Sequence, residues 1–271
     1  MKRWLLLLLL PFSAMSVERV VSIGGDVTQI VYALGAQQEL VARDSTSLHP
    51  PSATKLPDVG YVRQLNAEGI LAMQPTMVLS SALAKPSLAL EQVARAGVKV
   101  VMVPGDPDLV TIDRKIAVIA RALQKESQGA ALIQRMNKAL AQVPHQPLPI
   151  KVLFIMNNSG MNSMGAGTGT AADAVIRSAG LINAMGNVQH YQPLAQEGVV
   201  ASAPQLVVIG KSTAQSFGGK DNVWKLPGLA LTPAGKAQRL LVVDDMALLS
   251  FGLDTPDAIV RLRQAAERIK P

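Results

Sequence analysis

Residues 65–79 read LNAEGILAMQPTMVL, and residues 194–208 read LAQEGVVASAPQLVV. At a constant offset of 129 residues the two stretches share Leu, Glu, Gly, Ala and Pro at identical spacing, with apolar residues at the matching positions between them. Each copy is typical of a short helix, a proline break and a buried strand. The repetition therefore predicts two equivalent halves, an arrangement suited to capturing a small ligand at the interface between them.

The rest of the chain alternates β-branched apolar runs with helical patterns, which is typical of α/β layers built on mainly parallel sheets. The strands that we predict are 19–23, 40–43, 77–80, 98–103, 150–156, 206–209 and 240–243. The helices that we predict between them are 27–34, 67–73, 87–96, 171–179, 197–202 and 256–269. Glycine follows three of these helices, at Gly35, Gly97 and Gly180, where a left-handed cap is easy only for glycine.

The middle of the chain has a helical pattern without a strand. Apolar residues recur there at helical spacing, at Ile112, Ile116, Ile119 and Leu123 and then at Ile133, Met136, Leu140 and Val143. We expect nearly uninterrupted helix from Leu109 to Val143, one stiff spine that permits only small tilts of the two halves. The predicted organisation is a signal peptide at 1–16, an N-terminal α/β lobe at 17–107, a connecting helical segment at 108–145 and a C-terminal α/β lobe at 146–271.

The first 16 residues have the pattern of a cleaved export signal. A positively charged start precedes the apolar run Leu5–Leu10 and a small-residue cleavage site at Ala14 and Ser16. The run is shorter than the ~20 residues that a membrane-spanning helix needs. The chain has no cysteine, which excludes an N-terminal lipid anchor, disulfides and thiolate ligands. We therefore expect a periplasmic protein with no membrane anchor.

Charge and composition argue against several classes of function. Without Lys2 and Arg3 the chain has 24 basic and 19 acidic residues, a net charge of +5. This mild excess, with few aromatic residues and no Lys/Arg run, lacks the usual footprint of nucleic-acid binding. No G-x-S-x-G motif occurs and the three histidines are isolated, so we expect no enzyme. The G-x-G-x-G at Gly165–Gly169 lacks dinucleotide-binding spacing, and we interpret it as a flexible loop at the ligand cleft.

An exported α/β chain with two similar lobes and this repeated unit resembles the substrate-binding proteins of iron-siderophore, cobalamin and haem importers, over essentially its whole mature length. Three stretches are similar to the haem-binding branch: DVGYVRQLNAEGIL at 58–71, GTGTAADA at 167–174 and LPGLALTPAG at 226–235. The resemblance implies a monomer that captures haem as cargo and delivers it to an ABC permease dimer with its ATPase subunits, downstream of an outer-membrane haem receptor system. The alternative within the same superfamily is a ferric siderophore or cobalamin.

Tyr61 and Arg63 are the candidate haem-binding residues, because siderophore and cobalamin relatives usually lack this Gly-Tyr-x-Arg. A phenolate is a hard anionic oxygen that suits ferric iron, and tyrosine is an established axial haem ligand. The ordinary pKa of tyrosine is ~10, so ionisation near neutral pH needs help. Arg63 can provide a positive charge or a hydrogen bond, the role that the resemblance implies. The alternative is a buried tyrosine beside a solvated arginine.

The second lobe offers weaker candidates. The 129-residue offset puts His190 and Tyr191 opposite Tyr61, either as a second iron ligand or as part of the rim. Some haem-binding relatives have a histidine in the loop after the first strand of this lobe, which here has none. Met161 and Met164 in that loop could instead pack on a porphyrin face.

Glu68 and Glu197 are the matched acids of the repeat. The resemblance implies that one acid on each lobe pairs with arginines on the two permease subunits, which fits docking to a two-fold transporter. The alternative role is a favourable interaction of each acid with the dipole of its helix.

Overall fold

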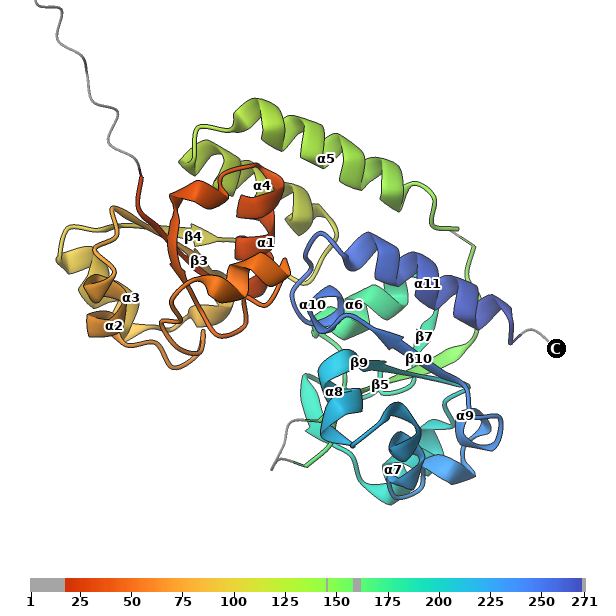
Figure 1. The fold of residues 1–271 in the computed structure, drawn as a ribbon. Helices are drawn as coiled ribbons and strands as arrows, with labels where there is room; N and C mark the ends of the chain where they lie inside the picture. Colours follow the sequence, from red (N-terminus) through yellow and green to blue (C-terminus); the bar gives the residue numbers. More distant parts are fainter. Residues whose placement is uncertain (1–17, 145, 158–161, 270–271) are drawn as a thin grey trace, which may run out of the picture.

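The computed structural model describes residues 18–144, 146–157 and 162–269, so the predicted signal peptide lies outside the described residues. The chain forms two α/β lobes (Figure 1). The N-terminal lobe has a parallel sheet in the order β2(Leu40–Arg43), β1(Val20–Ile23), β3(Met77–Ser81) and β4(Lys99–Val103). The C-terminal lobe has a mixed sheet in the order β10(Leu240–Val243), β9(Leu206–Gly210), β5(Lys151–Met156), β6(Met164–Ala166) and β8(Tyr191–Pro193), with β7(Ile182–Asn183) beside β5.

Helices cover the sheets and connect the lobes. In the N-terminal half they are α1(Gly25–Ala33), α2(Ala67–Ala72), α3(Leu88–Arg95), α4(Val110–Ala122) and α5(Glu126–Leu140). In the C-terminal half they are α6(Ala171–Ser178), α7(Gln196–Ser202), α8(Lys211–Ser216), α9(Pro233–Lys236), α10(Asp245–Leu249) and α11(Thr255–Glu267). Within the described ranges, no helix has both the length and the apolar character needed to cross a membrane.

The repeat has the same structural role in both lobes. Helices α2 and α7 begin 129 residues apart, and so do strands β3 and β9. Each of these strands pairs in parallel with the first strand of its own lobe, Met77 opposite Val20 and Leu206 opposite Val152. Both strands are buried along their whole length, which accounts for their continuous apolar sequence. The predicted equivalence of the two halves is confirmed.

The prediction of one long spine helix is wrong. The segment folds into two helices that lie against each other, α4 and α5, with Gln124 in the left-handed region (φ 54°) between them. A single helix of 35 residues would be roughly 50 Å long and could not keep both apolar stripes in one core. Folding back brings Gly129 of α5 so close to Ala120 of α4 that a Cβ on Gly129 would lie 2.6 Å from the Ala120 Cβ. Helix α5 lies beside α4 and extends towards α11 of the C-terminal lobe (Figure 1).

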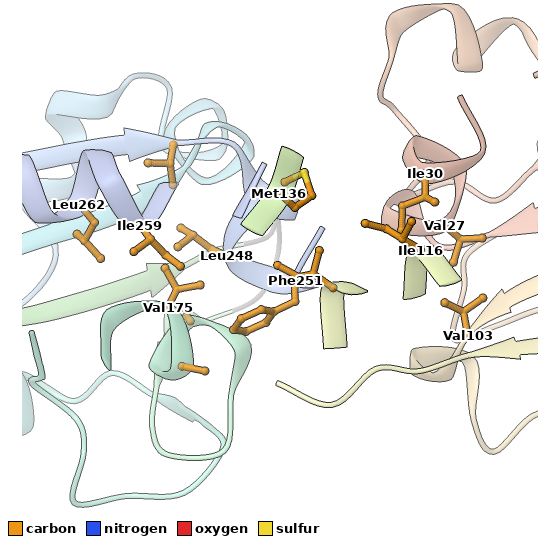
Figure 2. Close-up of a cluster of buried hydrophobic side chains, with 14 of the residues drawn as sticks. Val27, Ile30, Val103, Ile116, Met136, Val175, Leu248, Phe251, Ile259 and Leu262 are labelled. Carbon is orange, nitrogen blue, oxygen red and sulfur yellow. The ribbon is translucent and has the colours of Figure 1, made fainter. Parts of the chain in front are cut away.

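One hydrophobic core extends through both lobes. It includes Ile30 of α1, Ile116 of α4, Met136 of α5 and Ile259 of α11. Figure 2 shows Phe251 between the side chains of the C-terminal lobe and Ile116 of the N-terminal half. A separate apolar cluster covers the other face of each sheet. The lobes are therefore joined by packed side chains as well as by the chain, and the boundaries proposed at residues 107 and 145 stay predictions.

Candidate functional site

A cavity of about 720 Å³ lies between the two lobes. The N-terminal lobe contributes residues that follow the carboxyl ends of its strands, namely Gly24, Gly25, Thr46, Leu83 and Gly105, together with Tyr61 and Arg63. The C-terminal lobe contributes Met156, Gly169, Thr170, Ala171, His190, Tyr191, Met246 and Leu249. In α/β sheets, ligands bind outside the carboxyl ends of the strands, and this cavity has that position in both lobes.

Tyr61 lies on a turn that is tied to the end of β2. Gly60 precedes it with φ 101°, a conformation that favours glycine. The Asp58 carboxylate accepts hydrogen bonds from the Gly60 amide (2.8 Å) and the Ser45 hydroxyl (2.9 Å), and it pairs with the Arg43 guanidinium (2.7 Å). The Tyr61 side chain remains 45% exposed and lines the cavity. The turn that carries Tyr61 is therefore held in place, and the phenol is accessible to a ligand.

The fully buried carboxylate of Asp44 connects the loops beside this turn. Asp44 Oδ1 accepts hydrogen bonds from the Gly24 amide (2.9 Å) and the Ser47 hydroxyl (2.6 Å). Its Oδ2 accepts from the Thr46 amide (3.0 Å) and the Thr46 hydroxyl (2.6 Å). With four donors the buried charge is satisfied. The two loops that follow β1 and β2 are thus fixed to each other beside the cavity.

Arg63 and Tyr191 come from different lobes, and the charge of Arg63 acts on Tyr191. Burial raises the pKa of Tyr191 to about 12, and the positive charge of Arg63 counteracts that rise. The Tyr191 ring packs edge-on against Phe154, with ring centroids 6.4 Å apart. Arg63 does not form an ion pair with any carboxylate of the described residues. Tyr191 is therefore a neutral phenol near neutral pH, and the Arg63 charge is available to the cavity.

His190 lies beside Tyr191 on the cavity wall, as the repeat offset predicted. Its backbone has φ 58° and its side chain is exposed. The backbone of His190 pairs with that of Gly167 and Thr168 at 2.8 and 2.9 Å. A Cβ on Gly167 would lie only 2.4 Å from the Val188 carbonyl oxygen, so glycine is required for this close approach. Gly169, the last glycine of the G-x-G-x-G, lines the cavity just before α6, so this loop does border the cleft.

The methionines predicted to meet the ligand differ from those at the cavity. Met164 is half-buried at the start of β6 and does not line the cavity, and Met161 lies outside the described residues. Met156 and Met246 line it instead. Met156 ends a predicted strand, so the rule that ligands bind at the carboxyl ends of strands could have found it. Met246 lies on α10, a helix of five residues that sequence periodicity did not reveal.

Glu68 and Glu197 are both exposed, each in the first turn of its helix, and neither lines the cavity. The cap of α2 is the Asn66 side chain, which accepts from the Glu68 amide at 2.7 Å. Figure 1 shows α2 and α7 on parts of the two lobes that are remote from α5. The structure thus brings Tyr61, Arg63, His190 and Tyr191 together and leaves the two acids elsewhere.

Two α/β lobes with an accessible phenol and an exposed guanidinium in the cavity between them define a two-lobed protein for binding small molecules. The chain belongs to the periplasmic binding protein family, whose family model matches residues 20–247.

Individual relatives agree with this assignment. The chain is similar to the periplasmic heme-binding protein RhuT from Roseiflexus sp. RS-1, with 36% identity, a TM-score of 0.88 and coverage of 93% of this chain and 98% of that one. It is similar to the periplasmic heme-binding protein BhuT in complex with two hemes, with 38% identity, a TM-score of 0.85 and the same coverage. A vitamin B12-binding protein of Pectobacterium atrosepticum is 27% identical over 76% of this chain and 77% of its own length.

Proposed function

We propose that this protein captures haem in the periplasm and delivers it to an inner-membrane ABC permease. The observation that carries the proposal is the accessible Tyr61 phenol, held by Asp58 on a fixed turn, with Arg63 in the same cavity. The haem-binding relatives support it, since they match at 36–38% identity over 93% of this chain, whereas vitamin B12-binding relatives match at 27% over 76% of the chain or at 36% over only 35% of it.

Haem presents ferric iron, a large apolar ring and two carboxylates, and the cavity offers a partner for each. Tyr61 is the proposed axial ligand, because its exposed phenolic oxygen is accessible to iron, whereas burial raises the pKa of Tyr191 to about 12. Leu83, Met156 and Leu249 supply apolar and polarisable surface for the ring. The positive charge of Arg63 stabilises either the Tyr61 phenolate or a haem carboxylate. His190 is the proposed rim residue on the opposite wall.

Titration of the purified protein with hemin, cyanocobalamin and a ferric siderophore, followed by absorbance, tests this function. We expect saturable binding of hemin alone, with the Soret and charge-transfer bands of tyrosine-ligated ferric haem. Saturable binding of cyanocobalamin or the siderophore without hemin binding would favour the alternative function. The end point of the hemin titration also gives the number of haems bound.

Delivery is the second part of the proposal. Glu68 and Glu197 are exposed at equivalent places on the two lobes and outside the cavity, which fits one contact with each of two related permease subunits. Charged groups at the rim of an interface mainly steer and register the partners. The proposed route begins with export through the signal peptide at residues 1–16 and haem supply by an outer-membrane receptor system, and the protein itself is proposed to act as a monomer without catalysis.

A further inference from the structure

A buried lysine connects the two lobes at the inner wall of the cavity. Lys115, on α4, has 1% of its side chain exposed and pairs with Asp26 of α1, which is fully buried, at 2.5 Å. The same Lys115 ammonium donates hydrogen bonds to the backbone carbonyls of Ser250 and Phe251, the latter at 3.1 Å. Both carbonyls belong to the C-terminal lobe, in the segment between α10 and α11. All four residues line the cavity.

Further contacts hold the same segment against α1. The Gln29 side chain donates to the Asp254 carboxylate (2.5 Å) and accepts from the Leu253 amide (3.3 Å). Phe251 has a left-handed backbone (φ 51°), which is uncommon for a residue other than glycine and needs support from its surroundings. The hydrogen bond from Lys115 to the Phe251 carbonyl gives that support. The C-terminal lobe is thus fixed to the N-terminal lobe by directional bonds at one place.

A charged pair in this position contributes geometry more than stability. A buried ion pair is on average no better for folding than apolar residues of similar size, because both charges lose their hydration. The Oδ1 atom of Asp26 is buried and has no protein partner among the described residues, which adds to that cost. Hydrogen bonds from a fixed ammonium, however, allow only a narrow range of positions for their acceptors. The pair therefore restricts how the two lobes are oriented.

We infer that Lys115, held by Asp26, is the positioning residue that sets the angle between the lobes and thereby the width of the cavity at Tyr61. The part of this inference that concerns ligand binding rests on the proposed haem function. When the Lys115 bonds are lost, the lobes rotate more freely, and the cavity wall that carries His190 and Tyr191 moves relative to Tyr61. Bound haem then dissociates faster, although its iron ligand is unchanged.

The test variant removes both charges. Lys115→Met alone would leave Asp26 as an uncompensated buried charge and could prevent folding, so it is combined with Asp26→Asn. The matched control is Arg263→Met. Arg263 is also buried; it pairs with Glu267 at 2.9 Å and donates to the carbonyls of Gln146 and Ala179, and all these residues belong to the C-terminal half. Both variants lose a buried cation, and only one of them loses bonds between the lobes.

Two measurements test whether Lys115 sets the angle between the lobes. The chain has no cysteine, so Arg95→Cys and Asp221→Cys, at exposed positions in different lobes, give unique sites for spin labels. In the ligand-free protein, we expect the distance distribution between the labels to broaden or shift by about 2 Å in the double variant and to stay unchanged in Arg263→Met. Hemin dissociation should accelerate about tenfold in the double variant with the charge-transfer band of tyrosine ligation retained.

An unchanged label distance in the double variant, or an equal change in Arg263→Met, would overturn the inference. Loss of the charge-transfer band at an unchanged distance would also overturn it, because the pair would then act on iron ligation. The distance measurement uses protein without ligand. Failure of hemin to bind the unmodified protein would therefore refute the proposed function and leave the test of lobe positioning intact.

Discussion

At the scale of single residues, Tyr61 and Tyr191 form a natural pair for comparison, since both line the cavity and differ in exposure. Tyr61→Ala and Tyr61→Phe should each weaken hemin binding by about two orders of magnitude, ~3 kcal/mol, because each removes the ligand oxygen. Tyr191→Phe is the control and should keep the affinity and the charge-transfer band, because its phenol is held neutral. Circular dichroism checks the fold of all three. Retention of tight hemin binding by Tyr61→Phe would exclude Tyr61 as the ligand.

Tyr191 also predicts a pH dependence of stability. Its pKa of about 12 in the folded protein exceeds the ordinary value of ~10, so the folded state keeps a proton that the unfolded chain has released between these pH values. The stabilisation is fully present below about pH 10 and is lost as the pH rises towards 12, up to ~3 kcal/mol. Urea unfolding at about pH 9 and pH 11.5 should therefore show a larger loss of stability for the unmodified protein than for Tyr191→Phe. Equal losses of stability in the unmodified protein and in Tyr191→Phe would show that burial does not raise the pKa of Tyr191.

At the scale of secondary-structure elements, the close packing of α4 and α5 depends on Gly129. Gly129→Ala should lower the free energy of unfolding by about 1–3 kcal/mol, because the added Cβ would overlap the Ala120 side chain and push the helices apart. The control is Gly198→Ala in α7, where an added Cβ meets nothing. That variant should be more stable by about 0.5–1 kcal/mol, since alanine favours a helix. Urea unfolding measures both, and a stabilised Gly129→Ala would contradict the described packing.

The same elements explain what the sequence could reveal. Strands such as β3 and β9 were predicted because burial on both faces leaves a continuous apolar run. The break in the helix at Gln124 was not predicted, because this left-handed residue is neither glycine nor proline and the helical spacing of apolar residues continues through it. Strands β6 to β8 and helix α10 are too short for a periodic pattern to develop.

Within the candidate site, a local motif pointed to Tyr61 and Arg63 as proposed ligand-binding residues, whereas no motif pointed to Lys115. Lys115 follows Ile112 by three residues and precedes Ile119 by four, so it lies on the apolar side of α4. A lysine there would ordinarily extend its charge into water. Its acceptors are distant in the sequence, Asp26 by 89 residues and the carbonyls of Ser250 and Phe251 by 135 and 136, and only the tertiary fold brings them together.

At the scale of the whole molecule, capture and delivery should be separable. Reversing both Glu68 and Glu197 to Lys should leave hemin affinity unchanged, because neither acid lines the cavity, and should abolish hemin-stimulated ATP hydrolysis by the reconstituted importer. The control reverses Glu91 and Glu126, exposed acids in the first turns of α3 and α5. This second variant has the same net charge and should retain full stimulation. Normal stimulation of ATP hydrolysis by the Glu68 and Glu197 double variant would exclude the docking role and leave the two acids only an interaction with the dipoles of their helices.

The hydrogen bonds from Lys115 to the segment between α10 and α11 have a consequence for the order of events during synthesis. A ribosome makes Lys115 before its carbonyl partners at Ser250 and Phe251, which follow it by 135 and 136 residues. Until then the N-terminal half has an unfinished core and a buried charge without its full set of acceptors. We expect a fragment of residues 18–144 to lack a cooperative thermal transition, whereas the full chain melts in one step, as calorimetry can establish. A chain whose N-terminal half cannot complete its core until residues 250–251 have been made stays loose during most of its synthesis.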